Sequence, residues 1–472
     1  MNLKRLSKTK YLPAFLLLLT LISACVLNKH AATAEKGIWI TTGDKKLLLA
    51  RQPGSLTFTP SGSSDLKVIA VDPGRTFQQV DGFGFTLTGG SATLINRLPA
   101  AEKTRLLQDL FSPSGIGVSY LRISLGASDL SAEPFTYNEL PAGETDVDQD
   151  RFSISREFED LIPVLKEIRT INPAIGIMAS PWTAPTWMKD NHSFKGGRVQ
   201  PEYYASYAKY FVKYLNAMKA AGITIDAITI QNEPLHPGNV PSMYMEANDQ
   251  AEFIKTALGP AFKAAGIKTK IIIYDHNADK PDYPLAILKD DEARQYVDGS
   301  AFHLYGGTID ALSAVHDAFP DKHIYFTEQW VGGPGNFAED LKWHVTNLIV
   351  GASRNWSRTV LEWNLASDPE YRPHTEGGCT NCLGAITIGP ELRKNVAYYI
   401  IGHASKFVPP GATRIYSSIA DQLDNVAFKT PDGRTVLVVV NTAAAAQQFN
   451  ISYKGSMAAT ELSAGAVATY IW

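Results

Sequence analysis

The sequence lacks the features that would indicate a nucleic-acid or nucleotide-binding protein. Its formal net charge is only −3, so no polyanionic partner is expected. It contains no basic stripe, no glycine-rich phosphate loop and no metal-ligand cluster at zinc-finger spacing. The remaining composition, 45% hydrophobic and 19% charged, is that of an ordinary globular protein. We therefore expect no nucleic-acid partner.

Long apolar runs are also missing, and the run near the N-terminus is too short to cross a bilayer. It covers residues 12–22. Four basic residues precede it: Lys4, Arg5, Lys8 and Lys10. A basic region followed by a short apolar region is typical of a secretory signal peptide. Residues 1–24 are therefore predicted to be a targeting segment.

The apolar run ends at Ile22-Ser23-Ala24-Cys25. Small residues directly before a cysteine resemble the bacterial lipobox, which would make Cys25 the lipidated first residue of the mature protein. An ordinary secretory signal with a chance cysteine is the alternative. Because Val26 rather than aspartate follows, resemblance to bacterial sorting rules favours a lipid anchor in the outer membrane.

Cysteine is scarce, with three residues in the chain, and two of them form the segment Cys379-Thr380-Asn381-Cys382. Outside the cytoplasm a disulfide between Cys379 and Cys382 is the default expectation. His374 and Glu376 lie nearby in the sequence and leave a metal site as an alternative.

From about residue 80, strand-like runs alternate with helical ones, which predicts βα units and a parallel sheet. Eight strand candidates cover residues 80–86, 118–124, 175–180, 225–231, 270–274, 299–304, 323–328 and 358–364. Eight units in about 320 residues favour an α/β fold of the (β/α)8 TIM-barrel type. A doubly wound open sheet is the alternative.

Short strand-like segments occupy both ends of the chain. They cover residues 37–42, 46–50 and 66–71 before the barrel, and 425–429, 435–441, 448–453 and 466–472 after it. The tail has too few strands for a complete sandwich, so we predict one side β-sandwich built from both chain ends. The expected divisions are 26–75 and 407–472 for the sandwich and 76–406 for the catalytic barrel.

Two glutamates close strand-like runs, Glu233 after the fourth strand and Glu328 at the end of the seventh. Strand tips of α/β barrels carry the catalytic residues, and a pair of carboxylates is the machinery that cleaves glycosidic bonds. Retention requires an ionised nucleophile and a proton donor whose pKa is raised. Arg122, at the tip of the second strand, could supply the cation that keeps one carboxylate ionised.

These motifs resemble glycoside hydrolase family 30, which includes lysosomal glucosylceramidase. The resemblance spans nearly the whole mature chain and rests on landmarks in the order that the family shows. They are Asp81-Gly82-Phe83-Gly84, Tyr120-Leu121-Arg122-Ile123, the segment 179–188, Asn232-Glu233-Pro234, His303-Leu304-Tyr305, Thr327-Glu328, Glu362-Trp363-Asn364-Leu365 and the segment 402–407.

The resemblance implies Glu233 as the general acid/base, Glu328 as the nucleophile and Asn232 as the partner of the sugar 2-hydroxyl. It also implies that His303 and Tyr305 orient the carboxylates, and that no metal or organic cofactor is used. The remaining substrate-site candidates are Arg122, Asp129, Trp182, Trp330 and Trp363. Each has a structural alternative, such as a buried ion pair for the arginine or core packing for a tryptophan.

One loop, residues 373–382, departs from the corresponding loop of glucosylceramidase and leaves the substrate open. We expect cleavage of β-glucosidic bonds in glucans or oligosaccharides, of the β-glucosidase or β-1,6-glucanase type. Glucosylceramide, β-xylosides and xylan are the enzymatic alternatives. A glycan-binding surface lipoprotein without catalysis is the alternative from another class.

Overall fold

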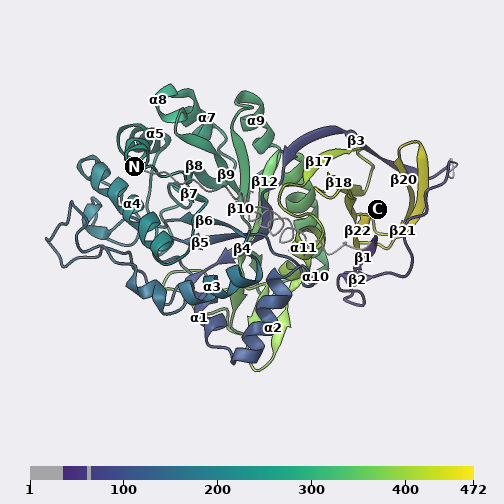
Figure 1. The fold of residues 1–472 in the computed structure, drawn as a ribbon, viewed down its shortest axis with the longest axis horizontal. Coiled ribbons are helices and arrows are strands. Elements are labelled where there is room, and N and C mark those ends of the chain that lie inside the picture. The colour runs from purple at the N-terminus through teal and green to yellow at the C-terminus, as the bar shows by residue number, and fades with distance from the viewer. Residues whose placement is uncertain (1–35, 61–64) are drawn as a thin grey trace, which may run out of the picture. The chain divides into compact units, whose positions relative to one another are not determined.

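The computed structural model describes residues 36–60 and 65–472, which form a closed eight-stranded barrel, a nine-stranded sheet and two small sheets (Figure 1). The predicted targeting segment and Cys25 lie outside the described residues. Within the described residues, no helix is both long enough and apolar enough to span a membrane.

The barrel consists of parallel strands that pair in sequence order, with β12 closing against β4. Its strands are β4 (Gly82–Leu87), β5 (Tyr120–Ser124), β6 (Gly176–Ser180), β7 (Ala227–Thr229), β8 (Lys270–Ala278), β9 (Val297–Gly307), β10 (His323–Glu328) and β12 (Ser357–Asn364). All eight predicted strands are present, so the (β/α)8 prediction is confirmed and the open-sheet alternative is wrong.

Helices follow the barrel strands and surround them (Figure 1). They are α1 (Gly89–Asn96), α2 (Ala100–Phe111), α3 (Leu161–Ile171), α4 (Tyr204–Ala220), α5 (Ala247–Phe253), α6 (Gly259–Ala264), α7 (Asp282–Lys289), α8 (Asp291–Arg294), α9 (Ala311–Ala318), α10 (Phe337–His344) and α11 (Val396–Ser405). Short 3-10 segments cover Ser155–Phe158, Thr186–Met188 and Pro201–Tyr203, and π-helical segments cover Ile254–Leu258 and Val345–Ala352.

The barrel interior is layered, and the layering positions the functional side chains. Seven strands each contribute one residue to a buried apolar cluster: Tyr120, Met178, Ala227, Ile272, Ala301, Tyr325 and Leu361. Because side chains alternate across a strand, the residues two positions further along face the same interior. On five of these strands they are polar: Arg122, Ser180, Thr229, His303 and Thr327. An apolar floor therefore supports a polar layer toward the C-terminal rim.

The nine-stranded sheet combines both chain ends, as predicted for the side sandwich. In spatial order its strands are β2 (Ala50–Arg51), β1 (Gly37–Thr41), β22 (Val467–Ile471), β19 (Thr435–Asn441), β18 (Leu423–Lys429), β17 (Thr413–Ser417), β3 (Lys67–Gln79), β20 (Gln447–Tyr453) and β21 (Ser456–Leu462). β1 pairs with β22, and β3 lies between β17 and β20. The predicted strand at 46–50 is wrong, since only Ala50–Arg51 is extended there.

Strand β19 explains how this sheet is fixed to the barrel. All seven of its residues are buried. Val436, Val438 and Val440 belong to the core cluster of the barrel, whereas Leu437 and Val439 belong to the core of the sandwich. A strand with apolar residues on both faces is covered on both faces. One face of the sheet therefore packs on the barrel, and the other closes the sandwich core.

Candidate active site

A cavity of about 450 Å³ opens among the strand ends that carry both predicted catalytic glutamates. Its volume lies within the usual range for small-ligand sites. The lining residues are Asp129, Trp182, Asn232, Glu233, His236, Asn239, His276, Asn277, Tyr305, Glu328, Trp330, Trp363, Cys379 and Cys382. Eight of the ten predicted catalytic and substrate residues are in this lining, and the other two, Arg122 and His303, are fully buried.

The two glutamates approach each other closely enough for the retaining geometry. One carboxylate oxygen of Glu233, one of Glu328 and a ring nitrogen of His303 all lie within 4.8 Å of one another. Retaining pairs are about 5–5.5 Å apart, whereas inverting pairs leave roughly 6.5–9.5 Å for a water molecule. Within the described part of the chain, this trio is the only histidine and carboxylate cluster compact enough for a metal ion. The arrangement suits attack by a carboxylate on the sugar.

Glu328 is surrounded by donors that stabilise its charged form. Arg122 Nη1 donates to Oε2 at 2.5 Å, and the Tyr305 hydroxyl donates to Oε1 at 2.9 Å. Burial raises the pKa of Glu328 above its ordinary value, and the charge of Glu233 adds to this rise, while the charges of His303 and Arg122 oppose it. Two direct donors, one of them the cation Arg122, thus hold this carboxylate in place for nucleophilic attack.

Glu233 has a different partner, one that can exchange a proton with it. His303 Nδ1 lies 3.1 Å from Glu233 Oε1, and His303 Nε2 lies 3.1 Å from Asp275 Oδ1. Burial disfavours the charged form of His303. The charge of Glu328 and the bonds to Asp275 and Glu233 outweigh this and raise the pKa of His303 to about 9. The bond from His303 lowers the pKa of Glu233 despite its burial. In the free site the shared proton therefore lies on His303, within reach of Glu233.

Asp275 holds Arg122 and His303, two side chains that contact the catalytic glutamates. Arg122 Nη2 (2.7 Å), Thr229 (2.8 Å) and Thr327 (2.6 Å) donate to its carboxylate, and His303 is a fourth partner. Despite complete burial, the charge of Arg122 and the partners His303 and Thr327 hold the pKa of Asp275 far below its ordinary value. This carboxylate is therefore a permanent anion between two cationic side chains.

A backbone irregularity in β8 places Asp275 in this position. Tyr274 and Asp275 have φ angles of +71° and +67°, and the pairing with β9 shifts register between Tyr274 and His276. Left-handed backbone at such residues costs about 1–3 kcal/mol each and persists where the surroundings impose it. The bulge sets Asp275, rather than Tyr274, in the polar interior layer. Glu233 also has a positive φ, +45°, and its N–H donates to the Asp275 carbonyl at 3.0 Å.

The barrel and the side sandwich match the two domain models of one family. The model of the glycosyl hydrolase family 30 TIM-barrel domain matches residues 80–408, and the model of the family 30 beta sandwich domain matches residues 411–470. The chain belongs to glycosyl hydrolase family 30. It is therefore a glycoside hydrolase of a retaining family.

Relatives within family 30 align over most of this chain. An endo-1,6-β-D-glucanase of Aspergillus fumigatus is 33% identical over 456 residues, 90% of this chain and 92% of that protein. Lysosomal acid glucosylceramidase of Mus musculus is 29% identical over 436 residues, 86% of this chain and 83% of that protein. The solved structure of an endo-β1,6-glucanase gives a TM-score of 0.86 at 36% identity, covering 92% of this chain and 99% of that one.

Within this family 30 site, Arg122 and Asp129 take separate places. Both were substrate-site candidates from the sequence. Arg122 lies behind the lining and donates to Asn232 Oδ1 (2.6 Å), Ser180 (3.1 Å), Asp275 and Glu328. Asp129 lines the cavity, where burial and the charge of Glu328 raise its pKa to about 7. Arg122 thus orients protein groups, whereas Asp129 faces the cavity.

Three tryptophans form an aromatic wall that is at once core and cavity lining. The Trp182 and Trp363 ring centroids are 5.4 Å apart, and the Arg122 guanidinium lies 4.8 Å from the Trp182 ring and 5.8 Å from the Trp363 ring. Both rings belong to a small buried cluster against which Trp330 packs. All three also line the cavity, so core packing does not exclude these residues from the cavity surface.

Four lining residues of the family 30 site have no role assigned from the sequence: His236, Asn239, His276 and Asn277. The first two follow Glu233 on the loop after β7, and the others continue β8 beyond Asp275. Burial lowers the pKa of His276 to about 4, so this ring is neutral near pH 7. These residues could have been predicted as cavity lining from their positions, because each follows the end of a predicted barrel strand.

Proposed function

We propose that this family 30 enzyme is an endo-β-1,6-glucanase, with Glu328 as the nucleophile and Glu233 as the general acid/base. The observation that carries the chemistry is the carboxylate pair within 4.8 Å, with unequal surroundings. Glu328 receives two donors, Arg122 and Tyr305, whereas Glu233 faces a proton-bearing imidazole. Direct donors stabilise the carboxylate of a nucleophile, and a proton-bearing partner can supply the proton that a general acid delivers. In the free site burial raises the pKa of Glu328 and His303 lowers that of Glu233, the reverse of the pKa values that the two roles require, so the assignment rests on these contacts.

The first half of the reaction forms a covalent glycosyl-enzyme. Glu328 Oε attacks the anomeric carbon while the carbon–oxygen bond to the leaving sugar breaks. Glu233, protonated through His303, delivers its proton to the leaving oxygen. Because Asn232 Oδ1 accepts from Arg122, its amide group is oriented with Nδ2 as the donor for the sugar 2-hydroxyl. This bond strengthens in the oxocarbenium-like transition state.

The second half returns the enzyme to its starting state. Glu233, now a carboxylate, takes a proton from a water molecule, which attacks the same anomeric carbon from the face that the leaving sugar vacated. The ester bond to Glu328 breaks, and the product keeps the β-configuration. Arg122 and Tyr305 stabilise the departing carboxylate as its charge returns.

The relatives support the choice of substrate. The Aspergillus fumigatus endo-1,6-β-D-glucanase and the solved endo-β1,6-glucanase, at 33% and 36% identity, align over nine tenths or more of both chains, while the mouse glucosylceramidase is 29% identical. Product analysis on β-1,3-, β-1,4- and β-1,6-glucans, xylan and glucosylceramide tests this choice. We expect short β-1,6-linked oligosaccharides from the β-1,6-glucan alone, and release of glucose from glucosylceramide as the main activity would contradict it.

We also propose that the mature enzyme is a lipoprotein anchored through Cys25 outside the cytoplasm, in the outer membrane. The basic segment, the short apolar run and Ile22-Ser23-Ala24-Cys25 support this proposal. Cys25→Ser should release the protein from the membrane fraction without altering kcat or KM. Mass spectrometry that found a mature N-terminus beyond residue 25 would refute it.

A further inference from the structure

The loop of residues 373–383, which follows β12, forms one wall of the cavity and carries the Cys379–Cys382 disulfide. Both cysteines line the cavity together with Asp129, Glu328 and Trp330. Cys382 belongs to the buried cluster of Trp182 and Trp363, and Cys379 packs against it. The bond between the sulfurs is thus part of the surface that a bound sugar would meet.

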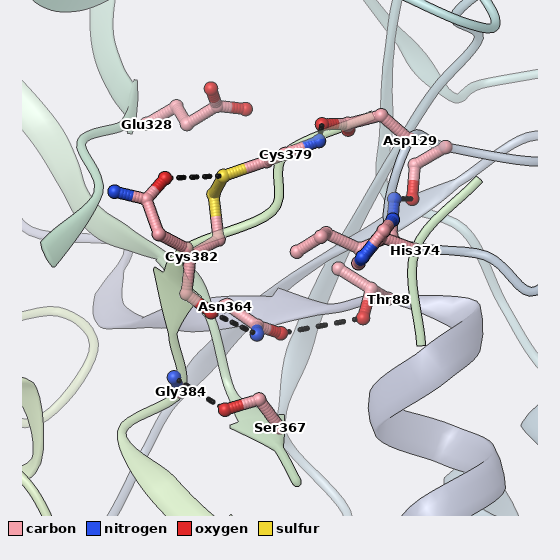
Figure 2. Close-up of a disulfide and its surroundings, with 12 residues drawn as sticks. Thr88, Asp129, Glu328, Asn364, Ser367, His374, Cys379, Cys382 and Gly384 are labelled. Carbon is pink, nitrogen blue, oxygen red and sulfur yellow. Dashed lines mark hydrogen bonds between the residues drawn. A yellow bond between two sulfur atoms is a disulfide. The ribbon is translucent and has the colours of Figure 1, made fainter. Parts of the chain in front are cut away.

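One half of the loop is attached to Asp129. The Cys379 N–H donates to Asp129 Oδ2 at 3.2 Å, and the Thr375 N–H donates to the Asp129 carbonyl at 2.9 Å. Figure 2 shows the Cys379 nitrogen directed at this carboxylate. A Cβ at Gly378 would lie 2.4 Å from the Asp129 carbonyl oxygen, so this close approach needs glycine. The position of the Asp129 carboxylate therefore depends on the loop.

The other half of the loop is attached to the short segment that follows the strand of Glu328. β14 (Cys382–Leu383) pairs with β11 (Val331–Gly332), which begins directly after Trp330. The Gly333 N–H donates to the Asn381 carbonyl at 2.7 Å, and Asn364 Nδ2 donates to the Cys382 carbonyl at 3.2 Å. The disulfide joins the two halves, so it holds the Asp129 side of the cavity at a fixed distance from the Glu328 side.

We propose that the Cys379–Cys382 disulfide is a positioning and specificity element, which holds Asp129 in register with Glu328 so that the sugar binds between them. This inference rests on the proposed function only in taking a β-glucan as the substrate. The catalytic pair does not touch the loop through any hydrogen bond between described residues. Opening the disulfide therefore weakens substrate binding more than it slows bond cleavage.

The contact with Cys379 also governs the charge on Asp129. Burial and the charge of Glu328 raise the pKa of Asp129, and the bond from the Cys379 N–H lowers it. When the loop loosens and this bond is lost, the pKa of Asp129 rises further. The ionised form, which accepts from sugar hydroxyls, then requires a higher pH, so the acid limb of kcat/KM moves toward higher pH.

The test measures kcat and KM on soluble β-1,6-glucan and on an aryl β-glucoside before and after reduction with excess dithiothreitol. One dithiothreitol gives two electrons and two protons, the sulfur–sulfur bond opens to two thiols, and the reagent closes to its cyclic disulfide. We expect KM for the glucan to rise about tenfold, the effect of one hydrogen bond to a charged group, with kcat changed less than about threefold. The acid limb of kcat/KM should shift upward in pH.

Two full-length variants complete the test. Cys379→Ser/Cys382→Ser should show the raised KM without reductant and no response to it, which excludes effects of dithiothreitol elsewhere. Gly378→Ala should raise KM with the disulfide intact, whereas Glu376→Gln, at an exposed position of the same loop, should leave both constants unchanged. Circular dichroism establishes that each variant is folded.

An unchanged KM and an unchanged acid limb, in protein whose two free thiols have been titrated, would overturn the inference. A lower melting temperature with unaltered constants would do the same, because it would show a purely structural disulfide. If the glucan is not cleaved but the aryl glucoside is, the proposed substrate fails, and the effect of reduction is then judged on the aryl glucoside alone.

Discussion

Asp275→Asn is the substitution that probes the polar layer most directly. It keeps the shape of the side chain but removes the anion that binds Arg122 at 2.7 Å and His303 at 3.1 Å. Both the Asp275 and Arg122 side chains are fully buried. Removing one partner of a buried pair costs about 3–5 kcal/mol. Arg122 keeps Glu328 at 2.5 Å, so we expect the lower end, about 3 kcal/mol of unfolding free energy.

The same substitution should change the pH dependence in two ways. His303 loses an anionic partner that raises its pKa, so the alkaline limb of kcat/KM should move to lower pH. The folded-state pKa of Asp275 is depressed, so its contribution to stability is full above about pH 4 and is lost as the pH falls further. The difference in unfolding free energy between wild type and variant should therefore shrink below about pH 4.

Asp298→Asn is the matched control. Asp298 accepts from His323 (3.0 Å) and Tyr325 (2.6 Å), but it lies at the start of β9, at the opposite end of the barrel strands from the catalytic pair, and its side chain is 23% exposed. Urea unfolding and pH–rate profiles of both variants give the comparison. Asp275 would not be the anchor of the site if Asp275→Asn were as stable as wild type. The same conclusion would follow if the alkaline limb of kcat/KM lay at the same pH in Asp275→Asn and Asp298→Asn.

Three other substitutions separate further parts of the account. Glu233→Ala should keep activity on substrates with activated leaving groups, and added azide should restore turnover and give a β-glycosyl azide; an α-azide would contradict the assignment. Asp129→Ala should lower kcat/KM on glucosides by about 2 kcal/mol more than on xylosides, which lack the 6-hydroxymethyl group; equal losses would refute its role in recognition. His403, whose pKa burial lowers to about 3, bonds Thr469 and Thr41 as a neutral ring. The unfolded chain binds a proton there below about pH 6.5, so wild type should lose about 2 kcal/mol more than His403→Gln between pH 6.5 and 5, as urea unfolding would show.

The barrel could be predicted because buried parallel strands are continuous apolar runs. Ile324, Tyr325 and Phe326 of β10 are fully buried, and the same holds for Ile271, Ile272 and Ile273 of β8 within a few per cent. The signal is weaker in the sandwich. β21 lies at the edge of its sheet, and its sequence SMAATEL alternates only loosely, so no strand was predicted there. β17 was missed because its sequence, TRIYS, contains one aliphatic residue, Ile415, and so forms no apolar run.

The catalytic glutamates could be predicted because each closes a strand beside a recognisable motif. The anchor beneath them could not. Asp275 meets side chains from β5, β7, β9 and β10, and these contacts depend on the bulge at Tyr274, which no local pattern announces. The sequence also placed Arg122 among the sugar-binding candidates, because a strand position does not show which groups the side chain contacts. Its sequence position fixes the strand tip, but only the barrel geometry shows that it points behind Glu328.

Labelling of the nucleophile tests the central claim most directly. A 2-deoxy-2-fluoro-β-glucoside with a good leaving group forms the glycosyl-enzyme but hydrolyses slowly, because the fluorine destabilises the oxocarbenium-like transition state of both steps. Peptide mapping of the inactivated enzyme should place one fluoroglucosyl group on Glu328. A label on Glu233, or product of inverted configuration with no label on either glutamate, would contradict the account.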